Sequence, residues 1–346
     1  MQSPLFDSPR LVDYPRGIGF LAVGRRVPKM ANSAETTAHF IGIDLAGPAL
    51  RAIAVSNAGA VIDRREASLD RERVVQQVAL MVRELTDAAP NLKAVGVAIP
   101  GLVDRKTDRV VASRDLPAGI RENLHAELMK ATGLRFELEN DANAAAYGEY
   151  KVGAGRGGRD LFYMSIGEGI GGAIIHDGRL WTGISGLAGE VGHITIDTEG
   201  SECECGNTGC LETVASGPNL VRRAKDRLHR DSTSSLSVLG IKADFTADDV
   251  IREAKNGDDF ALMMVERTGK YIGTGVATVI NLLNIERIVL GGGVMEAGEM
   301  ILDPIIQEAR RRAFQPCFDA TQILVGTLGK DASAVGAAML ARDAGN

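Results

Sequence analysis

Residues 39–63 have the sequence HFIGIDLAGPALRAIAVSNAGAVID, in which short apolar runs alternate with turn residues. A Gly-Pro pair and an Asn-Ala-Gly stretch divide it into three segments of residues that favour strands. We therefore expect three consecutive strands, which form a meander that opens the fold.

Beyond this stretch, strands and helices alternate twice. The first round comprises a helix near 71–88, a buried strand at 94–99, a helix near 120–132, a strand at 135–139 and a helix that begins at 141. The second round starts near 153 and comprises strands at 161–166 and 171–175, a long helix at 258–283, a strand at 287–290 and a last helix at 333–341. Two similar rounds predict two related α/β lobes.

The overall composition excludes several classes of protein. The chain has 346 residues, 45% of them apolar and 24% charged, which suits a globular protein with a core in each of two lobes. Its net charge of −6 argues against a nucleic-acid partner, because nucleic-acid-binding domains usually carry a basic face. No apolar run approaches the roughly 20 residues that cross a bilayer, so we expect no membrane span.

The segment 1–38 precedes the first predicted strand. It contains four arginines and a short apolar patch at 18–23, but it lacks the hydrophobic core and cleavage site of a signal peptide. We expect a disordered extension. Met30 lies shortly before the first strand and is an alternative start of translation, so whether residues 1–29 are translated stays open.

The strongest chemical signal is the stretch 192–212, GHITIDTEGSECECGNTGCLE. His193, Cys203, Cys205 and Cys210 supply one imidazole and three thiols, which make a complete tetrahedral set for a structural zinc ion. The alternative is a group of buried thiols beside an unrelated histidine. Three of the four cysteines in the chain lie here, and this clustering favours a metal over disulfides and a reducing, cytoplasmic compartment.

The second signal is ENDANAAAYGE at 139–149. Asp141 lies at the predicted junction of a strand and a helix, where a carboxylate can face a cleft and act as a general base. The alternative is a helix N-cap, since aspartate accepts hydrogen bonds from the free amides of a first turn. Asn140 and Asn143 allow the same two interpretations.

Glycines surround two further groups of candidate residues. In GISGLAGEVGH at 183–193, Glu190 lies three residues before His193, where it could accept a ligand hydroxyl; a surface salt bridge is the alternative. Three glycine-rich turns follow predicted strands, at 44–47, 167–172 and 291–293. Exposed amides in such turns can bind phosphate, although each turn alone also fits an ordinary tight turn.

Together these residues resemble the ROK family, named for repressors, open reading frames and kinases, and in particular its bacterial glucokinase and hexose-kinase branch. The resemblance covers about residues 39–341 and rests on VGVAIPGLVD, ENDANAAAYGEY, IGEGIGGAIIHDGRLWTGISGLAGEVGH, CECGNTGCLE, IVLGGGV and DASAVGAAMLA. It implies an α/β, actin-like (ribonuclease H-like) fold with a cleft between two lobes. The small lobe would comprise residues 39–142 and the C-terminal helix 332–346, and the large, zinc-bearing lobe residues 143–331.

The resemblance also implies a reaction, the transfer of the γ-phosphate of ATP, with Mg²⁺, to a hexose hydroxyl. Asp141 would take the proton from that hydroxyl, and His193 would use one ring nitrogen for zinc and the other for the sugar. The residues implied to bind the sugar are Gly101, Asn140, Glu190, His193 and Glu212. Those implied to bind the nucleotide are Asp44, Gly47, Gly167, Gly169, Gly291, Gly292 and Gly293. A homodimer or homotetramer is implied as well.

The phosphate side departs from the kinase pattern. The family's first turn is Asp, any residue, Gly, Gly, Thr, Lys, whereas here Gly47 is followed by Pro48 and Ala49, so an amide donor, a hydroxyl and a positive charge are missing. In the second turn Glu168 replaces a threonine, and its carboxylate should repel a triphosphate by about 1 to 4 kcal/mol at 4 Å. Whether these residues abolish the use of ATP stays open.

Two alternatives accompany the leading hypothesis of a hexose kinase. The first is a sugar sensor without kinase activity, because the Gly-Glu-Gly turn resembles that of ROK repressors; the roughly 38 residues before the first strand are too few for the DNA-binding domain of such a repressor. The second is a kinase for another hexose, such as an N-acylated amino sugar, mannose or fructose, since hydroxyl selection depends on the shape of the cleft.

Overall fold

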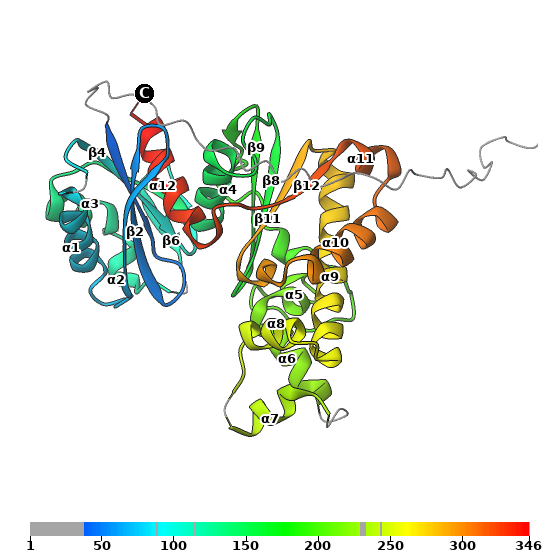
Figure 1. Ribbon diagram of the computed structural model, residues 1–346. Helices are drawn as coiled ribbons and strands as arrows, with labels where there is room; N and C mark the ends of the chain where they lie inside the picture. Colours follow the sequence, from blue (N-terminus) through cyan, green and yellow to red (C-terminus); the bar gives the residue numbers. More distant parts are fainter. Residues whose placement is uncertain (1–37, 88, 114, 229–232, 243, 346) are drawn as a thin grey trace, which may run out of the picture. The chain divides into compact units, whose positions relative to one another are not determined.

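The computed structural model describes residues 38–87, 89–113, 115–228, 233–242 and 244–345 (Figure 1). The expected extension at 1–38 lies outside these residues, apart from Ala38.

The first sheet contains the predicted meander. Its strands have the order β3-β2-β1-β4-β7 and comprise β1 (His39–Asp44), β2 (Ala49–Ser56), β3 (Val61–Ser68), β4 (Leu92–Ile99) and β7 (Phe136–Asn140). β1 pairs antiparallel with β2, and β2 with β3, whereas β4 lies parallel to β1 and β7 parallel to β4. β3 continues beyond the predicted end at 63 because it is an exposed edge strand whose polar residues give no apolar pattern.

Helices cover both faces of the central strands of this sheet, and successive side chains of a strand point to opposite faces. On one face, Ile41 and Ile43 of β1 pack with α1 (Val74–Thr86) and α3 (Leu124–Thr132). On the other face, Phe40 packs with two helices, α4 (Asp141–Val152) and α12 (Ala332–Asp343). Figure 1 shows the C-terminal helix α12 lying on this sheet of N-terminal strands.

Glycines allow α12 to approach the sheet and α4 closely. A Cβ atom added to Gly42 of β1 would lie 1.7 Å from the carbonyl oxygen of Ala334. A Cβ atom added to Gly336 of α12 would lie 1.6 Å from the carbonyl oxygen of Ala144 in α4. Both contacts are with backbone atoms, which cannot move aside as a flexible side chain can, so a larger residue must displace a whole helix.

We expect Gly336→Ala to lower the free energy of unfolding by about 1–3 kcal/mol, because the added methyl group forces α4 and α12 apart. Chemical denaturation measures this change. Gly119→Ala is the matched control: its Cβ atom would meet nothing within 4 Å, so stability should change by no more than about 0.5 kcal/mol. Equal stability of the two variants would contradict the close packing of α12.

The second sheet has the strand order β10-β9-β8-β11-β12 and comprises β8 (Leu161–Ile166), β9 (Ile170–His176), β10 (Arg179–Leu180), β11 (Arg287–Gly291) and β12 (Gln322–Val325). Two long helices, α9 (Asp259–Leu283) and α10 (Glu299–Arg312), pack against each other and share a hydrophobic core with β8 and β11. This arrangement explains the long apolar periodicity that predicted a core helix at 258–283.

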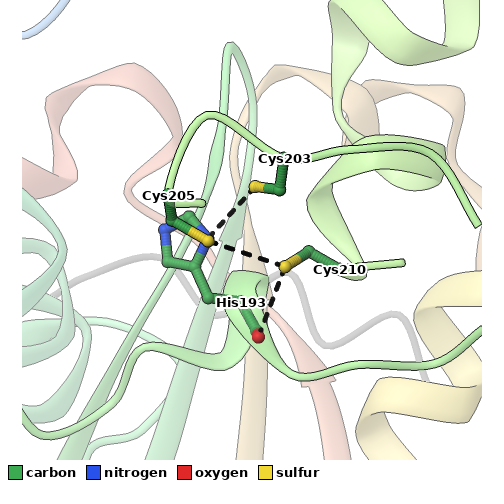
Figure 2. A group of neighbouring side chains, drawn as sticks. All are labelled: His193, Cys203, Cys205 and Cys210. Carbon is green, nitrogen blue, oxygen red and sulfur yellow. Dashed lines mark hydrogen bonds between the residues drawn. The ribbon is translucent and has the colours of Figure 1, made fainter. Parts of the chain in front are cut away.

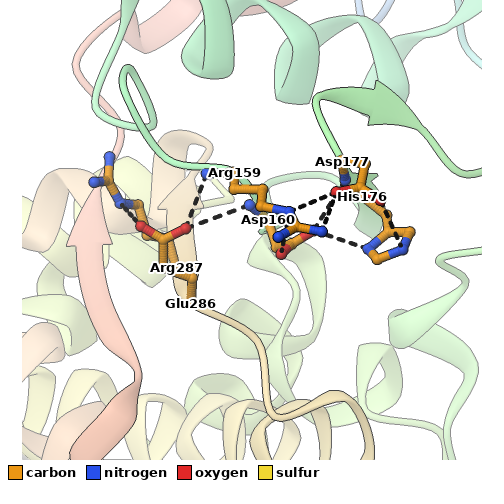
Figure 3. A network of polar contacts seen from close by, with 6 residues as sticks. All are labelled: Arg159, Asp160, His176, Asp177, Glu286 and Arg287. Atoms are coloured by element: carbon orange, nitrogen blue, oxygen red, sulfur yellow. Dashed lines mark hydrogen bonds and ion pairs between the residues drawn. The ribbon is translucent and has the colours of Figure 1, made fainter.

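A polar network joins the ends of three strands of the second sheet (Figure 3). A carboxylate oxygen of Glu286, next to β11, accepts a hydrogen bond from the amide of Arg159 at 2.9 Å. Asp160, just before β8, accepts from the amide of Asp177 at 3.0 Å and lies 2.8 Å from Nδ1 of His176, at the end of β9. Most of these side chains are exposed, so each pair contributes little energy. The network lies at the start of β8, and the strand's other end leads into the glycine turn at 167.

The remaining elements are α2 (Ala118–Arg121), α5 (Glu212–Ala215), α6 (Gly217–Leu228), α7 (Ser235–Lys242), α8 (Ala247–Lys255), α11 (Gln315–Ala320), the hairpin β5 (Leu102–Asp104) and β6 (Arg109–Ala112), and the 3₁₀ turns η1 (Val191–His193), η2 (Gly293–Ala297) and η3 (Gly329–Asp331). The two sheets with their helices confirm the predicted two-lobed α/β fold. The division between residues 142 and 143 stays a prediction. Within the described residues, no helix combines the length and the apolar character that a membrane crossing needs.

Candidate functional site

The predicted junction of strand and helix is present at Asp141. β7 ends at Asn140 and α4 begins at Asp141. Asn140 is the N-cap, since its Oδ1 accepts a hydrogen bond from the amide of Asn143 at 3.0 Å. Its Nδ2 donates to Oδ1 of Asp141 at 3.0 Å and to the carbonyl oxygen of Gly101 at 2.9 Å. Asp141 is therefore not the N-cap of α4. The N-cap is Asn140, which holds the carboxyl group of Asp141 through a hydrogen bond.

The surroundings of Asp141 favour the protonated form of its carboxyl group. Burial raises its pKa to about 6, against the effect of the backbone amides of Ala142 and of Asp141 itself. The negative charges of Asp115 and Glu190 raise the pKa further. A general base is most effective when its pKa lies near the working pH, so this environment suits proton abstraction.

Asp44, at the end of β1, is a second carboxyl group with a raised pKa, and it is fully buried. Burial raises its pKa to about 7, the charge of Asp141 adds to the increase, and the amide of Ala46 and the guanidinium of Arg51 oppose it. Ala46 donates its amide to Oδ1 at 2.9 Å, and Nη1 of Arg51 lies 3.6 Å from Oδ2. A buried carboxyl group whose charge is disfavoured by a neighbouring carboxylate is a chemically suitable place for a divalent cation, and oxygen ligands suit Mg²⁺.

A small pocket lies beside this junction, lined by Gly101, Leu102, Val103, Asn140, Asn143, Gly172, Gly186, Leu187, Ala188 and Glu190. One wall comes from β5 and the junction of β7 with α4, and the other comes from β9 and the loop before η1. Three predicted sugar-binding residues, Gly101, Asn140 and Glu190, line it. A larger open hollow near α6 and α7, beside Leu228 and Phe245, contains none of the predicted residues.

The other two predicted sugar-binding residues lie next to Glu190. These residues are His193 and Glu212, and the carboxylate of Glu190 is 3.8 Å from Nε2 of His193. Burial raises the pKa of Glu190, the charge of His193 lowers it, and Glu212 raises it. Glu212 accepts a hydrogen bond from the amide of Ile170 at 2.7 Å, so its carboxylate also touches the turn between β8 and β9.

The predicted metal ligands converge (Figure 2). Ligand atoms of His193, Cys203, Cys205 and Cys210 all lie within 4.8 Å of one another. Zinc bonds of about 2.0–2.3 Å in a tetrahedron place ligand atoms about 3.5–3.8 Å apart. The Sγ atom of Cys203 is 3.6 Å from Nδ1 of His193, and the Sγ atoms of Cys205 and Cys210 are 3.8 Å apart, so the donor set fits zinc in both type and spacing.

The chain can turn around this cluster because of Gly209. Its φ is +71°, and a Cβ atom there would lie 1.5 Å from the carbonyl oxygen of Asp197. The cluster connects η1, which carries His193, to the start of α5, which carries Glu212. An ion held here would therefore fix two predicted sugar-binding residues relative to each other.

The predicted nucleotide glycines fall into two groups. Added Cβ atoms at Gly47, Gly167 and Gly293 would meet nothing within 4 Å, so their backbones border open space that a ligand can enter. At Gly291, Gly292 and Gly169 a Cβ atom would collide with Tyr163, the backbone of Ile166 and the carboxylate of Glu212, respectively. Packing explains Gly291 and Gly292, whereas at Gly169 the carboxylate of Glu212 could move aside.

Some residues of the pocket escaped the sequence analysis. The buried Glu139, which pairs with the exposed Arg105, adjoins the pocket at the start of α4, and the loop 186–188 closes one side of the pocket. The sequence allows two interpretations of Asn143, and in the structure this residue lines the pocket. The sequences ENDAN and LVDRK both contain charged residues. The contact between Arg105 and Glu139 joins positions far apart in the chain, so no local pattern predicts it.

Comparison with known proteins gives consistent matches over most of the chain. A family model described as the ROK family matches residues 40–344. A glucokinase of Halalkalibacterium halodurans is 33% identical over 325 residues, which cover 89% of this chain and 96% of that protein. The crystal structure of a ROK family glucokinase from Streptomyces griseus in complex with glucose and AMPPNP has a TM-score of 0.79 and 32% identity, covering 88% of this chain and 99% of that one. A xylose repressor of Bacillus spizizenii is 28% identical over 333 residues, covering 92% of this chain and 81% of the repressor.

Proposed function

We propose that this chain, which belongs to the ROK family, is an ATP-dependent hexose kinase of the glucokinase type. The observation that carries the proposal is the partly buried Asp141 at the start of α4, beside a pocket lined by Gly101, Asn140 and Glu190. A carboxylate with a pKa near neutral next to a pocket rich in hydroxyl-binding groups suits the abstraction of a proton from a sugar.

In the proposed mechanism, the ionised carboxylate of Asp141 accepts the proton of one hexose hydroxyl. The hydroxyl oxygen forms a bond to the γ-phosphorus of ATP, and the bond from that phosphorus to the bridging oxygen breaks, so ADP leaves. Asn140 keeps the carboxylate in place through its hydrogen bond, and Glu190 with Glu212 holds other hydroxyls. Mg²⁺ bound with ATP, near Asp44, would neutralise charge on the phosphates.

The zinc ion is proposed as structural. The Nδ1 atom of His193 faces Cys203, whereas its Nε2 atom faces Glu190. This orientation supports the expected double role, in which one ring nitrogen binds the metal and the other donates to the sugar site. Four N/S ligands leave no open position for catalysis.

The glycine turns are proposed to bind the phosphates, with Gly47, Gly167 and Gly293 as the residues that border open space. The turn between β8 and β9 also contains Glu168, whose side chain is exposed. An exposed carboxylate can turn toward solvent, so its repulsion of a triphosphate is screened by water and salt. The altered turn should therefore weaken the use of ATP without preventing it.

Glu168→Thr should lower the KM for ATP by roughly fivefold, because about 1 kcal/mol of repulsion at the solvent-screened limit is removed. Steady-state kinetics at saturating hexose measure this. Glu168→Asp keeps the charge and serves as the control, with a KM close to that of the unaltered protein. A KM for ATP that is equal in all three proteins would contradict a role of Glu168 near the phosphates.

The direct test of the function is ADP release with Mg-ATP and a panel of hexoses: glucose, mannose, fructose and N-acetylated amino sugars. Turnover with at least one of them supports the kinase, and the sugar with the highest kcat/KM identifies the substrate. We propose glucose as the first candidate because glucokinases are among the relatives of this chain.

A sugar sensor without kinase activity is the second candidate, favoured by the altered turn at Pro48, Ala49 and Glu168 and by the xylose repressors among the relatives. Sugar binding in calorimetry, with no ADP from any hexose in the panel, would establish it. A homodimer or homotetramer, the absence of a nucleic-acid partner and a cytoplasmic location stay predictions; size-exclusion chromatography with light scattering tests the first.

A further inference from the structure

We propose that Asn143 supplies a hydrogen-bond acceptor to the sugar pocket, and that Glu139 and Arg105 set the orientation of its side-chain amide. The proposal rests on the proposed function, because it assigns a further residue of the same pocket.

The side chain of Asn143 has one unused hydrogen-bonding atom. Asn143 is 5% exposed and lines the pocket. Its Nδ2 donates to Oε1 of Glu139 at 3.0 Å, and its backbone amide donates to Oδ1 of Asn140. Within the described residues, no hydrogen bond reaches its Oδ1. A ligand hydroxyl that donates to this acceptor would add a hydrogen bond with a net contribution of about 0.5–1.5 kcal/mol.

Glu139 decides which end of the amide faces the pocket. A side-chain amide can be turned by 180°, which exchanges an acceptor for a donor. Glu139 is 3% exposed, and an ionised carboxylate only accepts hydrogen bonds, so the NH₂ group of Asn143 must face it. The reverse orientation would place two acceptor oxygens against each other. The Oδ1 atom is thereby directed away from Glu139.

Arg105 favours the charged form of Glu139, which is the form that only accepts hydrogen bonds. Burial raises the pKa of Glu139, and the guanidinium of Arg105 is the strongest influence that opposes the increase. Nε of Arg105 lies 3.4 Å from Oε2 of Glu139. Within the described residues that oxygen accepts no hydrogen bond, so its contact with Arg105 is an ion pair alone. The turn of the β5–β6 hairpin, which carries Arg105, is in this way connected to the side chain of Asn143.

The neighbouring Asn140 is not an equivalent acceptor. Its Nδ2 makes two hydrogen bonds, to Gly101 and Asp141, and its Oδ1 accepts from the amide of Asn143. All three are made within the protein, so Asn140 acts on the reaction through Asp141. Besides the carboxylate of Asp141, the acceptor at the start of α4 that remains for a ligand belongs to Asn143. It selects a group that donates, which a sugar hydroxyl does and a fluorine atom or a hydrogen atom at the same ring position does not.

The test is a binding cycle by calorimetry without ATP, using D-glucose and its monofluoro analogues, each with fluorine in place of one hydroxyl. At one ring position, fluorine should weaken binding to the unaltered protein roughly tenfold, the size of one buried hydrogen bond. In Asn143→Ala the same substitution should change binding by no more than about twofold. At the other ring positions, the ratio of the dissociation constants of the fluoro analogue and D-glucose should be the same in both proteins. Asn143→Leu, which keeps most of the volume, replaces the alanine variant if that one does not fold.

The role of Glu139 and Arg105 in orienting the Asn143 amide is tested separately, by the discrimination between hydroxyl and fluorine in their variants. Glu139→Gln can donate as well as accept, so the amide of Asn143 is free to turn, and the discrimination between hydroxyl and fluorine should shrink toward that of Asn143→Ala. Arg105→Met should shrink it in the same direction, whereas Arg105→Lys keeps the charge and should preserve it. A merely structural role would weaken the binding of all analogues alike and leave their ratios unchanged.

Two outcomes would overturn the inference, and they differ. If the unaltered protein binds no hexose, the proposed function fails and this inference fails with it. If it binds hexoses but Asn143→Ala and Asn143→Leu keep the same fluorine ratios at every ring position, the inference alone is wrong. Ratios that change in the Asn143 variants but not in Glu139→Gln or Arg105→Met would overturn the role of the ion pair.

Discussion

Replacement of Asp141 by asparagine is expected to lower kcat by about 10²–10⁴-fold, the usual contribution of a positioned general base. The amide keeps the size of the carboxylate and can still accept the hydrogen bond from Asn140, but it cannot take a proton. Affinity for the hexose should therefore change little. ADP release measures the loss of turnover, and calorimetry without ATP measures the retained binding.

The pH dependence of the unaltered protein provides a second measurement. Because the pKa of Asp141 is raised to about 6, kcat/KM for the hexose should fall as the pH decreases through that value, where the carboxylate becomes protonated. Asp115→Asn is the electrostatic control: it removes a charge that raises this pKa, so turnover should persist while the acid limb of the profile moves to lower pH.

Stability distinguishes loss of chemistry from loss of fold. A carboxyl group whose pKa is higher in the folded than in the unfolded state stabilises the fold at low pH, and this contribution is lost as the pH rises from about 4 through about 6. At pH 8 the buried charge of Asp141 is thus a cost, and Asp141→Asn should be at least as stable as the unaltered protein. If the variant keeps more than about a tenth of kcat, Asp141 is not the general base.

Much of the fold follows from local patterns. The meander at 39–63 was marked by its two turns, and the core helix α9 by its apolar periodicity. β3 and the β5–β6 hairpin were missed in whole or in part because their exposed residues are polar, and their pairing depends on a neighbouring strand. A strand that gains its order from a partner leaves little trace in its own sequence.

The site shows the same limit on a finer scale. Cysteine and histidine spacing predicted the ligand cluster, because four such donors close together in sequence have few other uses. The sequence could not tell which of Asn140 and Asp141 caps α4, since both residue types do so. The sequence also could not show that contacts with β8 explain Gly291 and Gly292. A glycine that close packing requires and a glycine that phosphate binding requires look identical in a single sequence.

Loss of the predicted zinc is the other change with a large expected effect. Cys205→Ser should release the metal, lower the midpoint of thermal unfolding and weaken hexose binding. Cys205 is exposed, so the substitution removes no core packing, and any loss of stability must come through the metal. Structural zinc contributes about 10–16 kcal/mol of binding free energy in small zinc-dependent domains, and even a fraction of that exceeds the effect of an ordinary surface substitution.

The matched control is Cys317→Ser, which alters the one cysteine outside the cluster, on α11. Elemental analysis should find one zinc per chain in the unaltered protein and in this control, and much less in Cys205→Ser. Hexose binding should fall with the metal content, because the cluster joins the segment of His193 to that of Glu212, and without it the two sugar-binding side chains lose their common anchor. A zinc-free protein with full stability, or a Cys205→Ser variant that keeps both its metal and its affinity, would show that these thiols are held by the fold and not by an ion.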